Sequence, residues 1–303
     1  MNPLNLLDPD ATTLPWVESP FFEHLIPSQG LSPRDEELVR RFARDGFVVV
    51  DHEMERFDQI ADGIVADLHG HYGEHRRVQD AWMFHEGVRS LATPPRILDI
   101  LSLLYRRRPI PFQTLNFEVG TQQPTHSDVI HFHSFPHHFM AGVWIPFEEV
   151  DEDNGPLHYF PGSHRLPDYD LDTLGLQPSY DNYPLYEQLV SGLQQVHRLE
   201  RVDAKVKRGQ AIIWAANLFH GGTPIRDPSR TRLSQVVHYY FSDCLYYIPL
   251  LSSPFRGRIC LREVVDIGTG EIVPHRYRGQ TVSLESAADT WRLPRPLPDF
   301  VRA

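Results

Sequence analysis

From Pro111 onward, short apolar runs alternate with Gly, Pro, Asn and Asp, and this pattern strongly limits the folds open to the chain. It is typical of an antiparallel β-sandwich or barrel. We expect strands at 113–119, 139–146, 157–161, 205–213 and 234–241, weaker strands between 259 and 273, and one inserted helix at about 185–198. The pattern therefore predicts a mainly β fold with flanking helices, whose core at about 111–245 is a double-stranded β-helix (a cupin-like jelly roll).

The first third of the chain carries helix signals. Ser32 can cap a helix over 33–45 that begins with Pro33 and ends at Gly46, and 47–50 is predicted to be a strand. Two more helices are predicted at about 57–72 and 95–106, whereas 1–31 lacks a clear period and is expected to form an irregular arm. Since the sequence has no internal repeat, we expect 1–303 to be one domain, with the helices packed on the jelly-roll core.

Composition excludes several classes of function. The 303 residues include 29 Lys and Arg against 40 Asp and Glu, a net charge of -11 that disfavours nucleic acid as a partner. Cys244 and Cys260 are the only cysteines, too few for a disulfide framework or a thiolate zinc site. Without a secretory signal or a membrane-spanning run, we expect a cytoplasmic protein with a small-molecule substrate, by charge a neutral or cationic one.

Three side chains have the types and spacing of metal ligands. His126 and Asp128 are two residues apart, so on an extended chain both point to the same face. His220 lies 92 residues after Asp128 (220 minus 128), directly behind the apolar run 211–214. Two imidazoles and one carboxylate on one face of an octahedral ion are the facial triad of non-haem Fe(II) oxygenases, which leaves three positions open.

Further along, a possible carboxylate site follows the last of these histidines. Arg232 and Ser234 share one face of a predicted strand, so a guanidinium and a hydroxyl could together hold a carboxylate deep in the barrel. The distal carboxylate of 2-oxoglutarate requires such a cation. Arg230 shares the same face and is the competing candidate.

Over about 45–244, the sequence resembles the phytanoyl-CoA dioxygenase family of Fe(II)- and 2-oxoglutarate-dependent oxygenases. The resemblance rests on the order of Asp45-Gly46-Phe47-Val48-Val49, His126-x-Asp128, Trp144, Asp153-Asn154-Gly155-Pro156-Leu157, Pro161-Gly162-Ser163-His164, His220-Gly221-Gly222 and Arg232. It implies that His126, Asp128 and His220 bind iron, and that Arg232, followed by a family-like run at 238–244, anchors 2-oxoglutarate. It also implies that Asn116 and Trp144 line the cosubstrate.

The same resemblance implies a reaction. Fe(II), 2-oxoglutarate and O₂ would together hydroxylate an unactivated C–H bond of a small metabolite, with release of succinate and CO₂. Asp128 favours hydroxylation over halogenation, because related halogenases carry a small residue in its place. Desaturation, epimerisation or ring formation would leave the same signature in the sequence.

Two other classes of function stay open at this point. His131-x-His133 could chelate zinc as in a cupin, which would give a 2-oxoglutarate-independent metalloenzyme, and a jelly roll can also be a non-catalytic binding protein. We expect instead that His131 and His133 line the mouth of the site and contact substrate. The Tyr- and Pro-rich segments 168–184 and 248–257 are either lids or surface loops.

Overall fold

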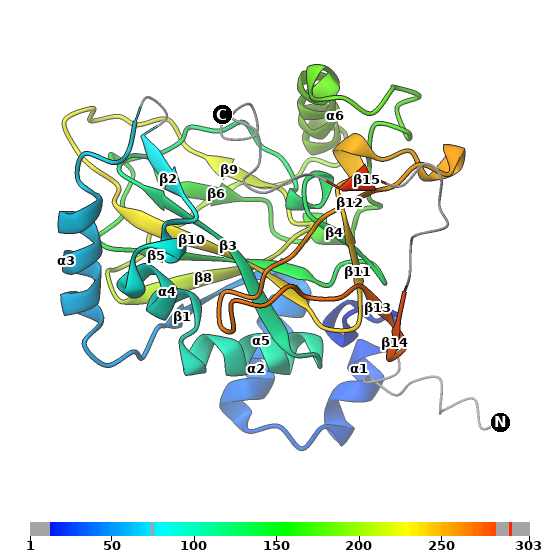
Figure 1. Cartoon of the computed structure of the whole chain (residues 1–303), viewed down its shortest axis with the longest axis horizontal. Coiled ribbons are helices and arrows are strands. Elements are labelled where there is room, and N and C mark those ends of the chain that lie inside the picture. The colour runs from blue at the N-terminus through cyan, green and yellow to red at the C-terminus, as the bar shows by residue number, and fades with distance from the viewer. Residues whose placement is uncertain (1–12, 74–75, 283–290, 293–303) are drawn as a thin grey trace.

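Two facing β-sheets form the centre of the computed structural model, which describes residues 13–73, 76–282 and 291–292 (Figure 1). The larger sheet is antiparallel, with the strand order β1-β8-β5-β10-β3-β2. Its strands are β1 (Phe47–Asp51), β2 (Arg77–Gln79), β3 (Pro109–Phe117), β5 (Met140–Pro146), β8 (Gln210–Ala215) and β10 (Ser234–Phe241). Apart from β2 and β3, neighbouring strands are not consecutive in the chain, as the crossing connections of a jelly roll require.

Opposite the larger sheet lies a small one with the order β7-β6-β9, made of β6 (Leu157–Tyr159), β7 (Val202–Asp203) and β9 (His220–Gly222). Apolar side chains of both sheets, among them Trp144, Tyr159 and Ile212, form one buried cluster between them. The remaining strands are β4 (His133–Phe135), β11 (Leu245–Tyr247), β12 (Cys260–Leu261) and β15 (Trp291–Arg292), which form a third sheet, and the pair β13 (Arg276–Tyr277) and β14 (Gln280–Thr281).

Helices cover the outer face of the larger sheet. α2 (Pro33–Asp45) starts where the Ser32 hydroxyl accepts a hydrogen bond from the Asp35 amide, and it ends at Gly46, whose φ of 81° suits glycine. α2 and α5 (Pro95–Tyr105) pack below the sheet in Figure 1, while α6 (Tyr183–Val196) lies on the opposite side. The other helices are α1 (Phe22–Leu25), α3 (Phe57–Leu68) and α4 (Glu86–Ala92).

The strand and helix predictions are confirmed in existence and order, with shifted boundaries. The strand predicted at 205–213 begins only at Gln210, and the strand predicted at 113–119 begins earlier, at Pro109. The predicted irregular arm contains α1 and short 3-10 turns, and Trp16 is fully buried in the core, a helical structure that the sequence pattern did not indicate. Residues 1–12 of that arm lie outside the described part. No helix in the described ranges is both long and apolar enough to span a membrane.

Candidate metal centre and its cavity

The three predicted metal ligands meet at one point between the two sheets. His126 and His220 form an isolated β-bridge with two backbone hydrogen bonds of 2.9 Å, which brings residues from distant parts of the chain side by side. The Nε2 atoms of His126 and His220 lie 3.6 and 3.8 Å from the two carboxylate oxygens of Asp128. All three residues are buried, and one ligand atom from each lies within 4.8 Å of the others.

Backbone carbonyls set the orientation of both imidazoles. Nδ1 of His126 is 2.9 Å from the Pro124 oxygen, and Nδ1 of His220 is 3.0 Å from the Leu218 oxygen. A carbonyl can only accept, so each Nδ1 donates, and each Nε2, on the side of Asp128, is left as the atom that can bind a metal. Histidines that bind metals are oriented in this way.

The environment shifts the pKa values of the triad residues in different directions. Burial, together with the neighbouring His126, lowers the pKa of His220 to about 4, so this imidazole is neutral at pH 7. Burial disfavours the charge of Asp128, but the two imidazoles outweigh it and hold its pKa below the ordinary range. Trp214 adds a hydrogen bond, since its Nε1 donates to Oδ2 of Asp128 over 2.8 Å. Burial opposes the charge of His126, but the hydrogen bond to Asp128, together with its negative charge, outweighs burial and raises the pKa of His126. The site therefore offers one carboxylate and two imidazole nitrogens, the donor set that Fe(II) accepts.

A cavity of about 390 Å³ opens beside the triad and includes Arg232 in its wall. Arg232 is 1% exposed, and its Nη1 donates to the Gly155 carbonyl over 2.9 Å. Its Nε has no hydrogen-bond partner in the part of the chain that the structure describes, nor has Nε1 of Trp144, whose ring lies 5.2 Å from the guanidinium carbon. Burial lowers the pKa of Arg232 to about 10, and the side chain is still cationic at pH 7. Buried polar groups in proteins are normally hydrogen-bonded, so these two unpartnered donors beside a buried cation fit a site for an anionic acceptor.

The structure separates Arg232 from its competitor. Arg230 forms an ion pair of 2.8 Å with Asp151 at the surface, and its side chain does not line the cavity. Ser234 is buried, but its hydroxyl donates to the Arg232 carbonyl and is not part of the cavity wall. The predicted cosubstrate contact of Ser234 is therefore not supported, whereas Trp144 lines the cavity beside Arg232.

Asn116, which was predicted to line the cosubstrate, lies on the face of β3 that points away from the cavity. On β3, Gln113, Leu115 and Phe117 line the cavity, so the alternation of strand side chains directs Asn116 to the opposite face. There its Nδ2 donates to Oε1 of Gln235 over 3.2 Å. Asn116 is thus part of the packing beneath the helices and does not line the cosubstrate site.

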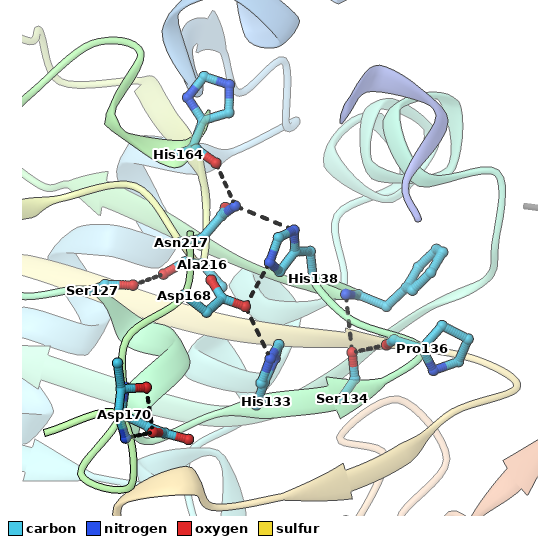
Figure 2. A network of polar contacts seen from close by, with 12 residues as sticks. Ser127, His133, Ser134, Pro136, His138, His164, Asp168, Asp170, Ala216 and Asn217 are labelled. Carbon is cyan, nitrogen blue, oxygen red and sulfur yellow. Dashed lines mark hydrogen bonds and ion pairs between the residues drawn. The ribbon is translucent and has the colours of Figure 1, made fainter. Parts of the chain in front are cut away.

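The two histidines predicted to contact substrate, His131 and His133, lie in different places. His131 lines the cavity, and its ring lies 5.0 Å from that of Tyr183 on α6. His133 does not line it; it points into a separate polar cluster, where its Nε2 is 3.3 Å from Asp168 (Figure 2). Because the backbone changes from a 3-10 turn to β4 between them, the two side chains do not form the predicted cupin-like pair.

His138 is the centre of that polar cluster. Its Nδ1 lies 2.5 Å from Glu18. Its Nε2 lies 2.7 Å from Asp168, and Asn217 links it to the His164 carbonyl (Figure 2). Burial would lower the pKa of His138, but the two carboxylates raise it to about 10. The cluster therefore joins the N-terminal turn at Trp16–Glu18 by charge pairs to His138, in the loop between β4 and β5, and to the loop around Asp168.

Sequence reasoning missed several cavity residues. His238 lines the wall and its Nδ1 is 2.9 Å from Oε1 of Gln113; extending the alternation from Ser234 along β10 would have found it. Tyr180, Tyr183 and Pro184 also line the cavity, so one of the two proposed lid segments does reach the site. No residue of 248–257 lines it. Arg262, another wall residue, follows a two-residue strand and had no pattern to mark it.

Comparison with known proteins identifies the family of the chain. The model of the family "Phytanoyl-CoA dioxygenase (PhyH)" matches residues 35–232. The chain belongs to this family. Its relatives include two proteins named "Phytanoyl-CoA dioxygenase, peroxisomal". The rat (Rattus norvegicus) protein is 27% identical, and the match covers 51% of this chain and 42% of the rat protein. The bovine (Bos taurus) protein is 26% identical, and the match covers 66% of this chain and 52% of the bovine protein. The chain thus spans about half the length of these relatives.

Solved structures confirm the predicted fold class. The non-heme alpha ketoglutarate dependent carbocyclase SnoK aligns with a TM-score of 0.59 at 19% identity, over 72% of this chain and 88% of that one. The epimerase SnoN, solved with Fe3+, alpha ketoglutarate and nogalamycin RO, aligns at 0.54 with 22% identity, over 70% and 86%. EctD from S. alaskensis, solved with 2-oxoglutarate and 5-hydroxyectoine, aligns at 0.52 with 19% identity, over 87% and 88%.

Proposed function

We propose that the protein is an Fe(II)- and 2-oxoglutarate-dependent dioxygenase that hydroxylates an unactivated C–H bond of a small metabolite. One observation carries the proposal. A fully buried arginine with an unpartnered Nε in the described part of the chain shares a cavity with two histidines and a carboxylate that fit a facial triad. Family membership and the Fe- and 2-oxoglutarate-bound structural neighbours support the same interpretation.

Each side chain has a role in this proposal. Nε2 of His126, Nε2 of His220 and the Asp128 carboxylate would hold Fe(II), and the Trp214 indole would keep the carboxylate in place. Arg232 would anchor the distal carboxylate of 2-oxoglutarate. When Fe(II) and 2-oxoglutarate are bound, they supply O₂ activation coupled to decarboxylation, with succinate and CO₂ as products.

The surroundings of Arg232 prepare it for this anion. Nη1 is already fixed by the Gly155 carbonyl, so the direction of the guanidinium plane is set before the cosubstrate binds. Nε of Arg232 and Nε1 of Trp144 are then two donors without an acceptor in the described ranges. A carboxylate would satisfy both while it neutralises the buried charge, and burial would exclude the water that competes for these donors.

The two alternative functions have less support. A zinc site on His131 and His133 would need the two rings to converge, and they point into different parts of the molecule. A non-catalytic binding protein would have no use for an intact triad beside a buried arginine that lacks an anion.

Anaerobic titration with Fe(II) and 2-oxoglutarate tests the proposal. The wild-type protein should develop the weak visible charge-transfer band of the iron chelate, and His126→Ala should abolish it. Arg232→Met should still bind iron but need at least about tenfold more 2-oxoglutarate, because a charge-assisted hydrogen bond is lost. Arg230→Met is the matched control, since its charge is paired at the surface. A wild-type protein that gives no band, or equal 2-oxoglutarate affinities for the two arginine variants, would refute the assignment.

A further inference from the structure

A second arginine lines the same cavity with few partners. Arg262 is 6% exposed, and its guanidinium lies 4.6 Å from the ring centroid of Phe132 and 5.9 Å from that of Phe112. Its Nη2 donates to the His131 carbonyl at 3.4 Å, near the limit of a hydrogen bond. Its Nε has no hydrogen-bond partner within the described ranges, where no ion pair with a carboxylate is found either.

Arg262 and Arg232 contact different parts of the cavity wall. Arg232 lies over Trp144, which pairs with Val236 of β10, and Val236 pairs in turn with Leu115 of β3. Arg262 instead lies against Phe112 and Phe132 and donates to the His131 carbonyl, and it shares none of these contacts with Arg232. When 2-oxoglutarate occupies Arg232, the Arg262 guanidinium is left without an anion.

The balance of charge in the cavity leads to the same conclusion. Three arginines line the described cavity wall, Arg77, Arg232 and Arg262, against one carboxylate, that of Asp128. Fe(II) and the 2-oxoglutarate dianion would neutralise each other, so the arginines would still exceed the carboxylate by two charges. A buried cationic excess is costly unless a ligand compensates it. The charge of the cavity is thus opposite to that of the whole chain, and it favours an anionic substrate over the neutral or cationic one expected from the net charge.

We propose that Arg262 binds a carboxylate of the substrate, and that the substrate is therefore a small organic acid. The inference rests on the proposed function, because it assigns Arg232 to the cosubstrate. The planar fork of the guanidinium matches a carboxylate in two parallel hydrogen bonds. Phe132 and Leu115, which also line the cavity, provide apolar surface for the carbon skeleton of such a substrate.

Benzoate and its uncharged counterpart benzamide are suitable probes, because they differ in charge and hardly in size. Each is titrated calorimetrically into the anaerobic complex of the protein with Fe(II) and saturating 2-oxoglutarate. The wild type should bind benzoate at least about tenfold more tightly than benzamide. Arg262→Met should lose this preference and keep the wild-type affinity for 2-oxoglutarate, while Arg262→Lys should retain part of it. Arg41→Met, which changes an exposed arginine on α2, serves as the control.

The outcomes separate the two proposals. If the visible band forms and the wild type binds benzoate no better than benzamide, or does not bind it, the role of Arg262 is refuted. The same holds if Arg262→Met keeps the preference for benzoate. If the band never forms in the wild type, the proposed function fails, whatever the benzoate titration shows.

Discussion

A single methyl group added at Gly142 should disturb the metal centre without touching any ligand. Gly142 on β5 pairs with Trp214 on β8, and a Cβ at this position would lie 2.1 Å from Cζ2 and 2.2 Å from Cε2 of the indole. Ordinary contacts begin near 3.4 Å, so the ring must move by about 1 Å or more. Cε2 is bonded to Nε1, the atom that donates to Asp128 over 2.8 Å. The displacement therefore acts directly on that hydrogen bond.

Two effects add to the cost of Gly142→Ala. Overpacking of a core costs about 1–3 kcal/mol, and a hydrogen bond to a charged group contributes about 1.5–3 kcal/mol. Since the two are coupled, we expect the free energy of unfolding of the metal-free protein to fall by about 2–4 kcal/mol in urea denaturation. Loss of a group that orients a metal ligand should weaken Fe(II) binding by about 10- to 100-fold in the anaerobic titration.

Gly192→Ala is the matched control for the same change. Gly192 lies inside α6, where an added Cβ meets no atom within 4 Å. We expect it to stabilise the protein by up to about 1 kcal/mol, because alanine favours the helix, and to leave Fe(II) affinity unchanged. If Gly142→Ala behaves like Gly192→Ala in both measurements, then the indole of Trp214 does not hold the Asp128 carboxylate in its orientation.

Three further changes test other parts of the structure. Trp214→Phe keeps most of the ring but removes the indole donor, so Fe(II) affinity should drop by about 10- to 100-fold, as measured by the visible band at saturating 2-oxoglutarate. Asn116→Ala should leave 2-oxoglutarate affinity unchanged but lower the free energy of unfolding by about 1–3 kcal/mol, because Gln235 loses a buried partner; a large loss of 2-oxoglutarate affinity would instead place Asn116 at the cosubstrate. Since the pKa of His138 is raised to about 10, its contribution to stability is complete below about pH 6.5 and is lost as the pH rises toward 10. His138→Gln should remove that slope, at most about 1.4 kcal/mol per pH unit, and an unchanged slope in urea denaturation between pH 7 and 10 would contradict the charge pairing.

Local sequence spacing predicted the triad because its chemistry is encoded in residue type. His126 and Asp128 are two residues apart on one segment, and together with a distant histidine they supply the two imidazoles and one carboxylate of a facial triad. Asn116 shows the limit of this reasoning. The side-chain period of a strand is two, so an error of one residue in the face assignment moves a side chain from the cavity to the opposite face. The register of β3 against β10 decides the face, and that register is a tertiary property.

His133 and Arg262 could not be placed from the sequence for a different reason. His133 follows a 3-10 turn, where the alternation that relates it to His131 breaks down. Arg262 lies after a strand of two residues, too short for any periodic pattern. Its position is fixed by pairing of β12 with β11 and by packing against two phenylalanines from elsewhere in the chain. Contacts of this kind become visible only in the folded structure.

Arg262 lies outside the part of the chain that matches the family model, whereas the metal triad and Arg232 lie inside it. The match ends at Arg232, and Arg262 lies thirty residues beyond it (262 minus 232). The triad and Arg232 belong to the matched part and are fixed by β-structure and backbone hydrogen bonds. The opposite wall is built in part from the turn and helix around Tyr183 and from the segment after β12. A rigid sheet that holds the reactive ion, with substrate contacts on less regular segments, lets the substrate change while the chemistry is kept. The charge of Arg262 is thus informative about this chain's own substrate in a way that Arg232 is not.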